Sequence, residues 1–210
     1  MNYLQPTHYL DYHHPAIQQM IDPFRDLPTL REQAAALYLH IRDGYRYNPY
    51  RISLRPEDYR ASVIVGHSDA HCVDKAILYV AGLRALGIPA RIHLGTVINH
   101  IAVERLTEKF GTNELSPHGM VNLYLDGKWL KASPAFNKEL CERCQVDPLE
   151  FDGTTDSVFQ QYNRTGNQFM EYTEDFGHFE DVPVSFMFET MARKYPTFAE
   201  KVKLGEVVKF

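Results

Sequence analysis

The stretch SDAHCVDKAILYVAGLRALGIPAR, Ser68–Arg91, sets a cysteine among small polar residues and histidines, directly before a long apolar run. The apolar residues of the run recur at helical spacing and few of its residues are charged, which predicts a helix buried on most sides. We expect this helix to begin near Ser68 or Asp69, with Asp69 as the N-cap candidate, and to end at Gly87, which Pro89 follows shortly after. Cys72 then falls in the first turn.

The position of Cys72 suits a nucleophile. A sulfur in the first turn lies near unpaired backbone N–H groups and the positive end of the helix dipole, and both favour thiolate over thiol. The same N–H groups can bind the oxyanion of a tetrahedral intermediate. A thiolate nucleophile also needs a general base, and His118, just before a predicted hairpin, is our candidate. The competing interpretation is a small core residue, because free cysteine is among the most buried types.

The segments around this helix predict a mixed α+β core. Thr29 and Glu32 have capping-box spacing and open a further helix. Ala90–Ile98 is expected to be a strand, and Asn99–Pro117 an insertion that carries a short helix. In GMVNLYLDGKWLKA, residues 119–132, two β-rich runs flank Asp126-Gly127, which is among the best signals for a two-residue hairpin.

The pattern is less regular beyond Pro134. It predicts a short helix at Lys138–Cys144, a long connecting region to about Val182, and a helix over Pro183–Lys194. We expect a single domain over residues 1–210. It would comprise an N-terminal arm (1–28), a core (29–137) and a C-terminal extension (138–210) packed on the core.

Composition narrows the class of protein. The chain has 210 residues, of which 44% are hydrophobic and 23% charged, and a net charge of -5, which is ordinary for a globular protein. No basic stripe indicates nucleic acid, and no apolar stretch approaches the length of a membrane span. The N-terminus lacks a signal-peptide pattern, and three cysteines argue against a disulfide framework. A reducing cytoplasm is therefore the expected location.

The order of cysteine helix, strand and histidine strand resembles the transglutaminase-like branch of the papain-type cysteine enzymes. The run from Gly66 through Cys72 to LRALGIPAR, residues 83–91, is similar to the family's cysteine helix and its ending. His118 with VNLYLDGKW, residues 121–129, is similar to its histidine strand and hairpin. ALYLHIRDGYRYNPY, residues 36–50, is similar to its preceding helix and tyrosine. The resemblance covers residues 29–137, and the rest of the chain resembles one bacterial subgroup.

The resemblance implies a papain/transglutaminase-like fold, in which a cysteine-bearing helix packs on an antiparallel sheet. It further implies acyl transfer from an amide or peptide carbonyl of a peptide or protein substrate. Cys72 would attack the carbonyl, its backbone N–H would support the oxyanion, and His118 would shuttle the proton. Hydrolysis is the default outcome, and no cofactor is implied.

The chain departs from the family where an aspartate normally orients the histidine, four residues beyond the hairpin tryptophan. Here that position is Ser133. A hairpin closed at Asp126-Gly127 sets Met120 opposite Ser133, so Ser133 lies two residues from His118 on the paired strand. A hydroxyl accepts the imidazole N–H but brings no negative charge. Asn122 and Asn137 are alternatives for this role, and the loss of charge favours a rival interpretation: an inactive scaffold that binds a peptide or protein.

Ten histidines also raise the possibility of a metal hydrolase that uses His67, His71 and His118. No His-Glu-x-x-His pattern is present, and zinc usually needs three or four converging protein ligands. We therefore predict no metal. Cys141 and Cys144 form a lone CxxC pair and are expected to pack against the core. The residues expected to line the substrate site are His67, His71, Tyr47, Asn122 and Asn137.

Overall fold

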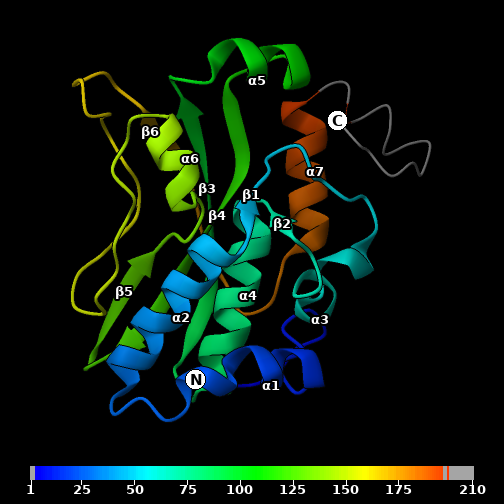
Figure 1. Ribbon diagram of the computed structural model, residues 1–210. Helices are drawn as coiled ribbons and strands as arrows, with labels where there is room; N and C mark the ends of the chain where they lie inside the picture. Colours follow the sequence, from blue (N-terminus) through cyan, green and yellow to red (C-terminus); the bar gives the residue numbers. More distant parts are fainter. Residues whose placement is uncertain (1–2, 196–197, 199–210) are drawn as a thin grey trace.

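The computed structural model describes residues 3–195 and 198, and it is built around a four-stranded antiparallel sheet with the order β5-β4-β3-β6 (Figure 1). A short parallel pair, β1 with β2, forms a second sheet. The elements, in chain order, are α1 (Pro15–Ile21), η1 (Asp22–Phe24), α2 (Leu30–Gly44), β1 (Arg46–Tyr47), η2 (Pro56–Tyr59), α3 (Ala61–Ile64), β2 (Asp69–Ala70), α4 (Cys72–Ala85), β3 (Ala90–Asn99), α5 (Val103–Phe110), β4 (Glu114–Leu125), β5 (Lys128–Ala132), α6 (Lys138–Arg143), β6 (Met170–Phe179) and α7 (Val184–Lys194).

Helix α4 is the centre of the fold. It contacts β3 and β4 on one side and α1, α2 and α3 on the others. Each of its residues from Cys72 to Arg84 is buried, as its nearly unbroken apolar sequence predicts. The arrangement is the α+β core, with a cysteine helix on an antiparallel sheet, that the sequence indicates.

The start of α4 differs from the prediction. The helix begins at Cys72 rather than near Asp69, because Asp69 is extended in β2 and pairs with Arg46 of β1. The N-cap is His71, whose Nδ1 accepts the Asp74 backbone N–H at 3.1 Å, while the Asp74 carboxylate accepts the His71 N–H at 3.2 Å. A histidine thus completes a capping box, and Cys72 is the first helical residue.

The predicted hairpin is present. Asp126 and Gly127 form its two-residue loop with φ values of 49° and 82°, as a type I′ turn requires. The pairing runs from Leu125↔Lys128 to Val121↔Ala132, the register expected from the turn. The predicted helices in the insertion and near the C-terminus are also present as α5 and α7, and Gly111 closes α5 with φ of 77°.

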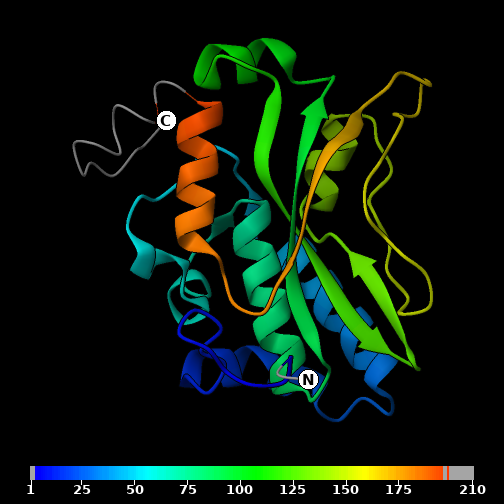
Figure 2. The same cartoon turned by 180° about the vertical axis from the view of Figure 1, so that it is seen from behind.

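The segment expected to be a long connecting region contains a strand. β6 pairs antiparallel with β3 along its whole length and forms an edge of the sheet (Figure 2). Its sequence, MEYTEDFGHF, carries four charged or titratable side chains besides its aromatic residues, and its pairing is interrupted by two irregularities. Charges and bulges are common on edge strands, and here they hide the alternation by which a strand is recognised from sequence.

Lys75 lies within α4 with no exposed surface. Its ammonium donates to the Arg42 backbone carbonyl at 2.8 Å, and burial lowers its pKa from 10.5 to about 7. In the unfolded chain this lysine is protonated at any pH below its ordinary pKa of 10.5. Between pH 7 and 10.5 the unfolded state therefore holds more protons than the folded state, and stability rises with pH across this window.

Lys75→Met should consequently be more stable than the wild-type protein at pH 7, and its advantage should shrink as the pH rises toward 10. The expected slope is about 1.4 kcal/mol per pH unit, the free energy of one pKa unit. Urea unfolding at several pH values measures this difference, and Lys109→Met, an exposed lysine of α5, controls for the loss of a lysine. If the difference in unfolding free energy between Lys75→Met and the wild-type protein stays constant across this pH range, Lys75 is not held neutral by burial.

Candidate active site

Cys72 lies at the meeting point of α4 and β4. The backbone N–H groups of Gly119 from β4, of Val73 and of Cys72 itself at the helix N-terminus lie near the sulfur and act to lower the pKa of the thiol. The side chain is 6% exposed. Three backbone donors from two elements therefore surround the sulfur, as the oxyanion interpretation of the first turn requires.

Gly119 allows β4 to approach the helix this closely. A Cβ at this position would lie 2.7 Å from Val73 Cα and 3.0 Å from Val73 N, closer than carbon atoms approach. The absence of a side chain brings the strand backbone onto the first turn of α4, and it carries the neighbouring His118 there as well. The glycine after the histidine is thus a packing requirement of the site.

Gly119→Ala should force β4 away from α4 and withdraw a donor from the Cys72 sulfur. We expect a loss of about 1–3 kcal/mol in unfolding free energy, the usual cost of overpacking. Gly66→Ala is the matched control, because a Cβ there meets nothing closer than 3.6 Å. Chemical denaturation of both variants measures the difference, and equal stabilities would contradict the close contact.

His118 is 2% exposed, and its Nδ1 atom is buried with no hydrogen-bond partner among the described residues. Burial, and to a lesser degree the neighbouring His71, lowers its pKa from 6.5 to about 4. The ring lies 6.0 Å from that of Tyr172 on β6, measured between centroids. The imidazole is thus neutral at pH 7, and one of its nitrogens is available to take or give a proton.

The protonation state of Cys72 corrects the sequence-based expectation of a thiolate. Burial raises its pKa from 9.0 to about 11, although the three backbone N–H groups act in the opposite direction. Removal of water therefore outweighs the helix N-terminus in this conformation. In this conformation the Cys72 thiol and the His118 imidazole are both neutral at pH 7.

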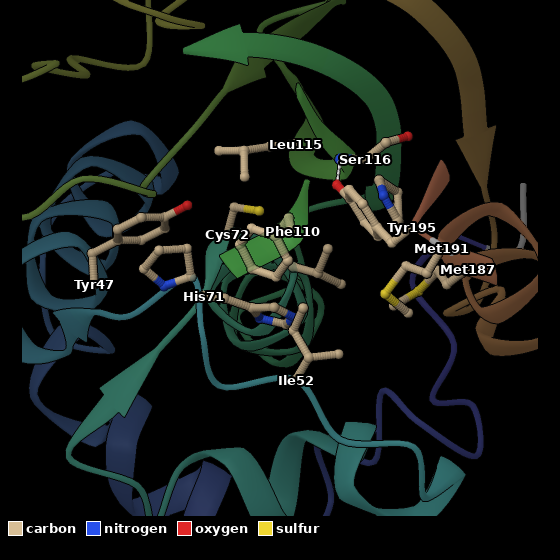
Figure 3. Close-up of a pocket in the computed structure, with 13 residues that line it drawn as sticks. Tyr47, Ile52, His71, Cys72, Phe110, Leu115, Ser116, Met187, Met191 and Tyr195 are labelled. Carbon is tan, nitrogen blue, oxygen red and sulfur yellow. Dashed lines mark hydrogen bonds between the residues drawn. The ribbon is translucent and has the colours of Figure 1, made fainter. Parts of the chain in front are cut away.

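The burial of Cys72 has a specific cause in the C-terminal helix. The thiol opens on a cavity of only about 40 Å³, one wall of which is formed by Met187, Met191 and Tyr195 from α7 and the residue after it (Figure 3). The Tyr195 hydroxyl accepts the Ser116 N–H at 2.6 Å and donates to the Glu114 carbonyl at 3.0 Å. This tail therefore closes the site, a contribution that no sequence motif indicates.

A second set of contacts holds the end of α7. The Lys194 ammonium lies 2.5 Å from the Glu114 carboxylate and 3.0 Å from that of Glu174 on β6. Figure 1 shows α7 beside the region where β1, β2 and the start of α4 meet, with α6 on the other side. Helix α7 is thus held against β4 and β6 at its C-terminal end.

Of the residues predicted to line the substrate site, Tyr47 and His71 do border the cavity (Figure 3). The Tyr47 hydroxyl interacts with the Cys72 sulfur, and burial raises the tyrosine pKa. Asn137 borders the larger groove beside the cavity rather than the cavity itself, and its Oδ1 accepts the Tyr47 backbone N–H at 3.0 Å. His67 borders neither this cavity nor the larger groove beside it.

Asn122 is engaged elsewhere. Its Oδ1 lies 3.0 Å from His93 Nδ1, and His93 Nε2 lies 2.7 Å from the Asp175 carboxylate on β6. Asn122 is also absent from the walls of the cavity. This network was not predicted from the sequence, because its carboxylate, Asp175, comes from β6, the strand that was not predicted.

Ser133 is 3% exposed and directly follows β5. Its N–H donates to the Ser157 carbonyl at 2.8 Å, and its own carbonyl accepts the Tyr38 hydroxyl at 2.9 Å. The β4–β5 register extends to Val121↔Ala132, so the next positions in line are Met120 and Ser133. The orienting role of Ser133 toward His118 stays a prediction.

The remaining histidines and cysteines form no obvious ligand set. Within residues 3–195 and 198, no three His, Cys, Asp or Glu side chains are grouped as a metal ion would require. Cys141 is buried and Cys144 half-buried, and both are free thiols. In the same part of the chain, no helix has the length and apolar composition needed to cross a membrane.

Comparison with known proteins agrees with this arrangement. Residues 18–134 match the family described as the transglutaminase-like superfamily, and the chain therefore belongs to it. The fold is also similar to the crystal structure of a "putative cysteine protease" from Cytophaga hutchinsonii, with 17% identity, a TM-score of 0.53 and coverage of 88% of this chain. The chain spans 48% of that protein's length. No curated protein sequence matches the chain.

Proposed function

We propose that the chain is a cysteine-dependent enzyme that transfers or hydrolyses the acyl group of an amide or peptide substrate. The observation that carries the proposal is Cys72 at the N-terminus of α4, where backbone donors from two elements surround its sulfur. His118, one residue from Gly119, supplies a buried imidazole whose Nδ1 has no hydrogen-bond partner among the described residues. A nucleophile, a base and oxyanion donors are the parts that acyl transfer needs.

The reaction follows from these parts. Cys72 gives its thiol proton to His118 as the sulfur attacks the substrate carbonyl carbon, and the oxyanion receives the N–H groups that surrounded the sulfur. The amide C–N bond then breaks, and the amine leaves with the proton from His118. Water attacks the resulting thioester, again through His118, and releases the acid with free Cys72. An amine in place of water gives transfer.

Opening of the site fits this chemistry. Burial raises the pKa of the thiol and lowers that of the imidazole, and these two shifts keep the resting pair uncharged. Displacement of α7 admits water and substrate, and removes much of the cause of both shifts. The helix-dipole and backbone donors can then favour the thiolate.

A peptide library tests the proposal. Wild-type protein and Cys72→Ala are incubated with the library, first alone and then with a biotin-tagged primary amine, and products are identified by mass spectrometry. New N-termini indicate hydrolysis, and amine-tagged peptides indicate transfer; either must be absent with Cys72→Ala. Identical product lists for the two proteins would refute the proposal.

A catalytically inactive binding scaffold is the second candidate, favoured by Ser133 at the usual aspartate position. Thiol reactivity separates the two. Iodoacetamide alkylation between pH 5 and 9, read for each cysteine by peptide mass spectrometry, should show that Cys72 reacts more slowly once His118 is replaced by alanine. An alkylation rate of Cys72 that is the same in the wild-type protein and in His118→Ala would favour the binding scaffold.

A further inference from the structure

A groove of about 1020 Å³ lies beside the Cys72 cavity. This volume is at the upper end of the usual range for ligand sites, ~300–1,000 Å³, and leaves room for several residues of an extended peptide. The groove and the cavity share the walls formed by Tyr47, Pro49, Ile52 and Leu115, so the groove leads to the nucleophile. No residue of α7 borders the groove, which is therefore accessible while the thiol is covered.

The charge of this groove is opposite to that of the protein. Its walls carry five arginines against three carboxylates, whereas the whole chain has 22 basic residues against 27 acidic ones. All five cations are arginines, whose planar fork binds carboxylates in two-point contact. They are Arg46, Arg51, Arg55, Arg105 and Arg143.

Not all of these arginines are compensated. Arg51 and Arg46 share the single Asp69 carboxylate, at 2.7 and 3.5 Å, and the Arg46 side chain is 72% exposed. Arg105 on α5 stacks over the Tyr50 ring at 5.1 Å and forms no ion pair with a carboxylate of the described residues. The other two are paired with acidic residues in the groove itself.

Arg46 and Arg105 belong to elements that lie near Cys72 or near residues of its cavity. Arg46 pairs across the β1–β2 ladder with Asp69, three residues before Cys72. Arg105 comes from α5, the same helix whose last residue, Phe110, borders the Cys72 cavity. The groove therefore receives positive charge from two elements, β1 and α5, that also lead to residues of the Cys72 cavity.

We propose that this groove selects acidic peptides, with Asp or Glu side chains flanking the bond that Cys72 attacks. The inference rests on the proposed function for the identity of the reaction, but not for binding. A peptide also suits the uncharged part of the lining, which combines apolar surface with the side-chain amides of Asn48 and Asn99. A nucleic acid would need a denser array of cations, because its backbone carries one charge per phosphate.

Binding is measured with the full-length Cys72→Ala variant, so that no reaction can occur. Fluorescence anisotropy compares a rhodamine-labelled peptide rich in glutamate with the same peptide carrying glutamine at every glutamate. We expect the acidic peptide to bind at least ~10-fold more tightly, with a preference that declines as salt is added. Arg105→Glu should remove most of this preference, whereas Arg164→Glu, an arginine outside the groove, should not.

Each outcome has a defined meaning. Equal affinity for the two peptides, or a preference that survives Arg105→Glu, would overturn the inference. An equally charged single-stranded oligonucleotide that binds as tightly as the acidic peptide would also overturn it. Selective binding by a protein whose Cys72 proves unreactive would retain the inference and reject the proposed enzyme, so the two failures can be told apart.

Discussion

His118→Ala should reduce kcat/KM for amide cleavage by about 10²–10⁴-fold, the range that a positioned general acid–base contributes. The reason is that the resting thiol is neutral: burial raises the pKa of Cys72 to about 11, so the sulfur needs a base to receive its proton. His118 Nδ1 is buried and has no hydrogen-bond partner in the part of the chain that the structure describes, so no such bond has to break before it takes that proton. Library substrates found with the wild-type protein provide the assay.

His118→Gln distinguishes chemistry from packing. Glutamine keeps hydrogen-bonding groups at the site but cannot shuttle a proton at neutral pH, so it should be as inactive as the alanine variant. His178→Ala, an exposed histidine of β6, should retain activity. A His118→Gln variant that remains folded and active would remove His118 from the mechanism, whatever the behaviour of His118→Ala.

Loosening α7 should expose the nucleophile. The double variant Lys194→Ala/Tyr195→Phe removes the two tyrosine hydrogen bonds to the backbone of β4, along with the ion pairs to Glu114 and Glu174. Hydrogen bonds contribute about 1 kcal/mol each, and partly exposed ion pairs up to about 1 kcal/mol. A combined loss of about 1.4–2.8 kcal/mol raises the open population ~10–100-fold, and alkylation of Cys72 should accelerate by that factor when opening is fast.

The other cysteines serve as internal references for this experiment. Cys141 and Cys144 lie away from the α7 contacts, so iodoacetamide should modify them at unchanged rates. Tyr162→Phe, which removes the hydroxyl of a tyrosine that is 57% exposed, is the matched control. If all three cysteines react faster together, the variant has lost global stability. If Cys72 keeps its slow rate in the variant, α7 does not control access to it.

The central part of the fold follows from local sequence patterns. The apolar periodicity after Cys72, the capping box at Thr29 and the Asp126-Gly127 turn each act within a few residues, and each produced the predicted element. The turn also set the β4–β5 register, because a two-residue hairpin allows a single pairing. Such local signals can be interpreted from a single sequence, without knowing which distant segments pack against the element.

The prediction of the helix start illustrates the limit of these signals. Asp69 was the expected cap, but it is extended in β2, which pairs with β1 more than twenty residues earlier in the chain, so the helix begins at Cys72 instead. The edge strand β6 was missed for a similar reason. Its charged residues are typical of a loop, and the segment is a strand because β3 supplies its backbone hydrogen-bond partners.

The sequence by itself determined that Cys72 lies in the first turn of a buried helix and that His118 enters the strand leading to the hairpin, because periodicity and turn chemistry are local. Only the tertiary structure decided the state of the site. Residues of α7, more than one hundred positions from Cys72, exclude water from the thiol, and their burial of it outweighs the backbone donors that favour a thiolate. Desolvation depends on everything packed around a group, so no motif at Cys72 could reveal it.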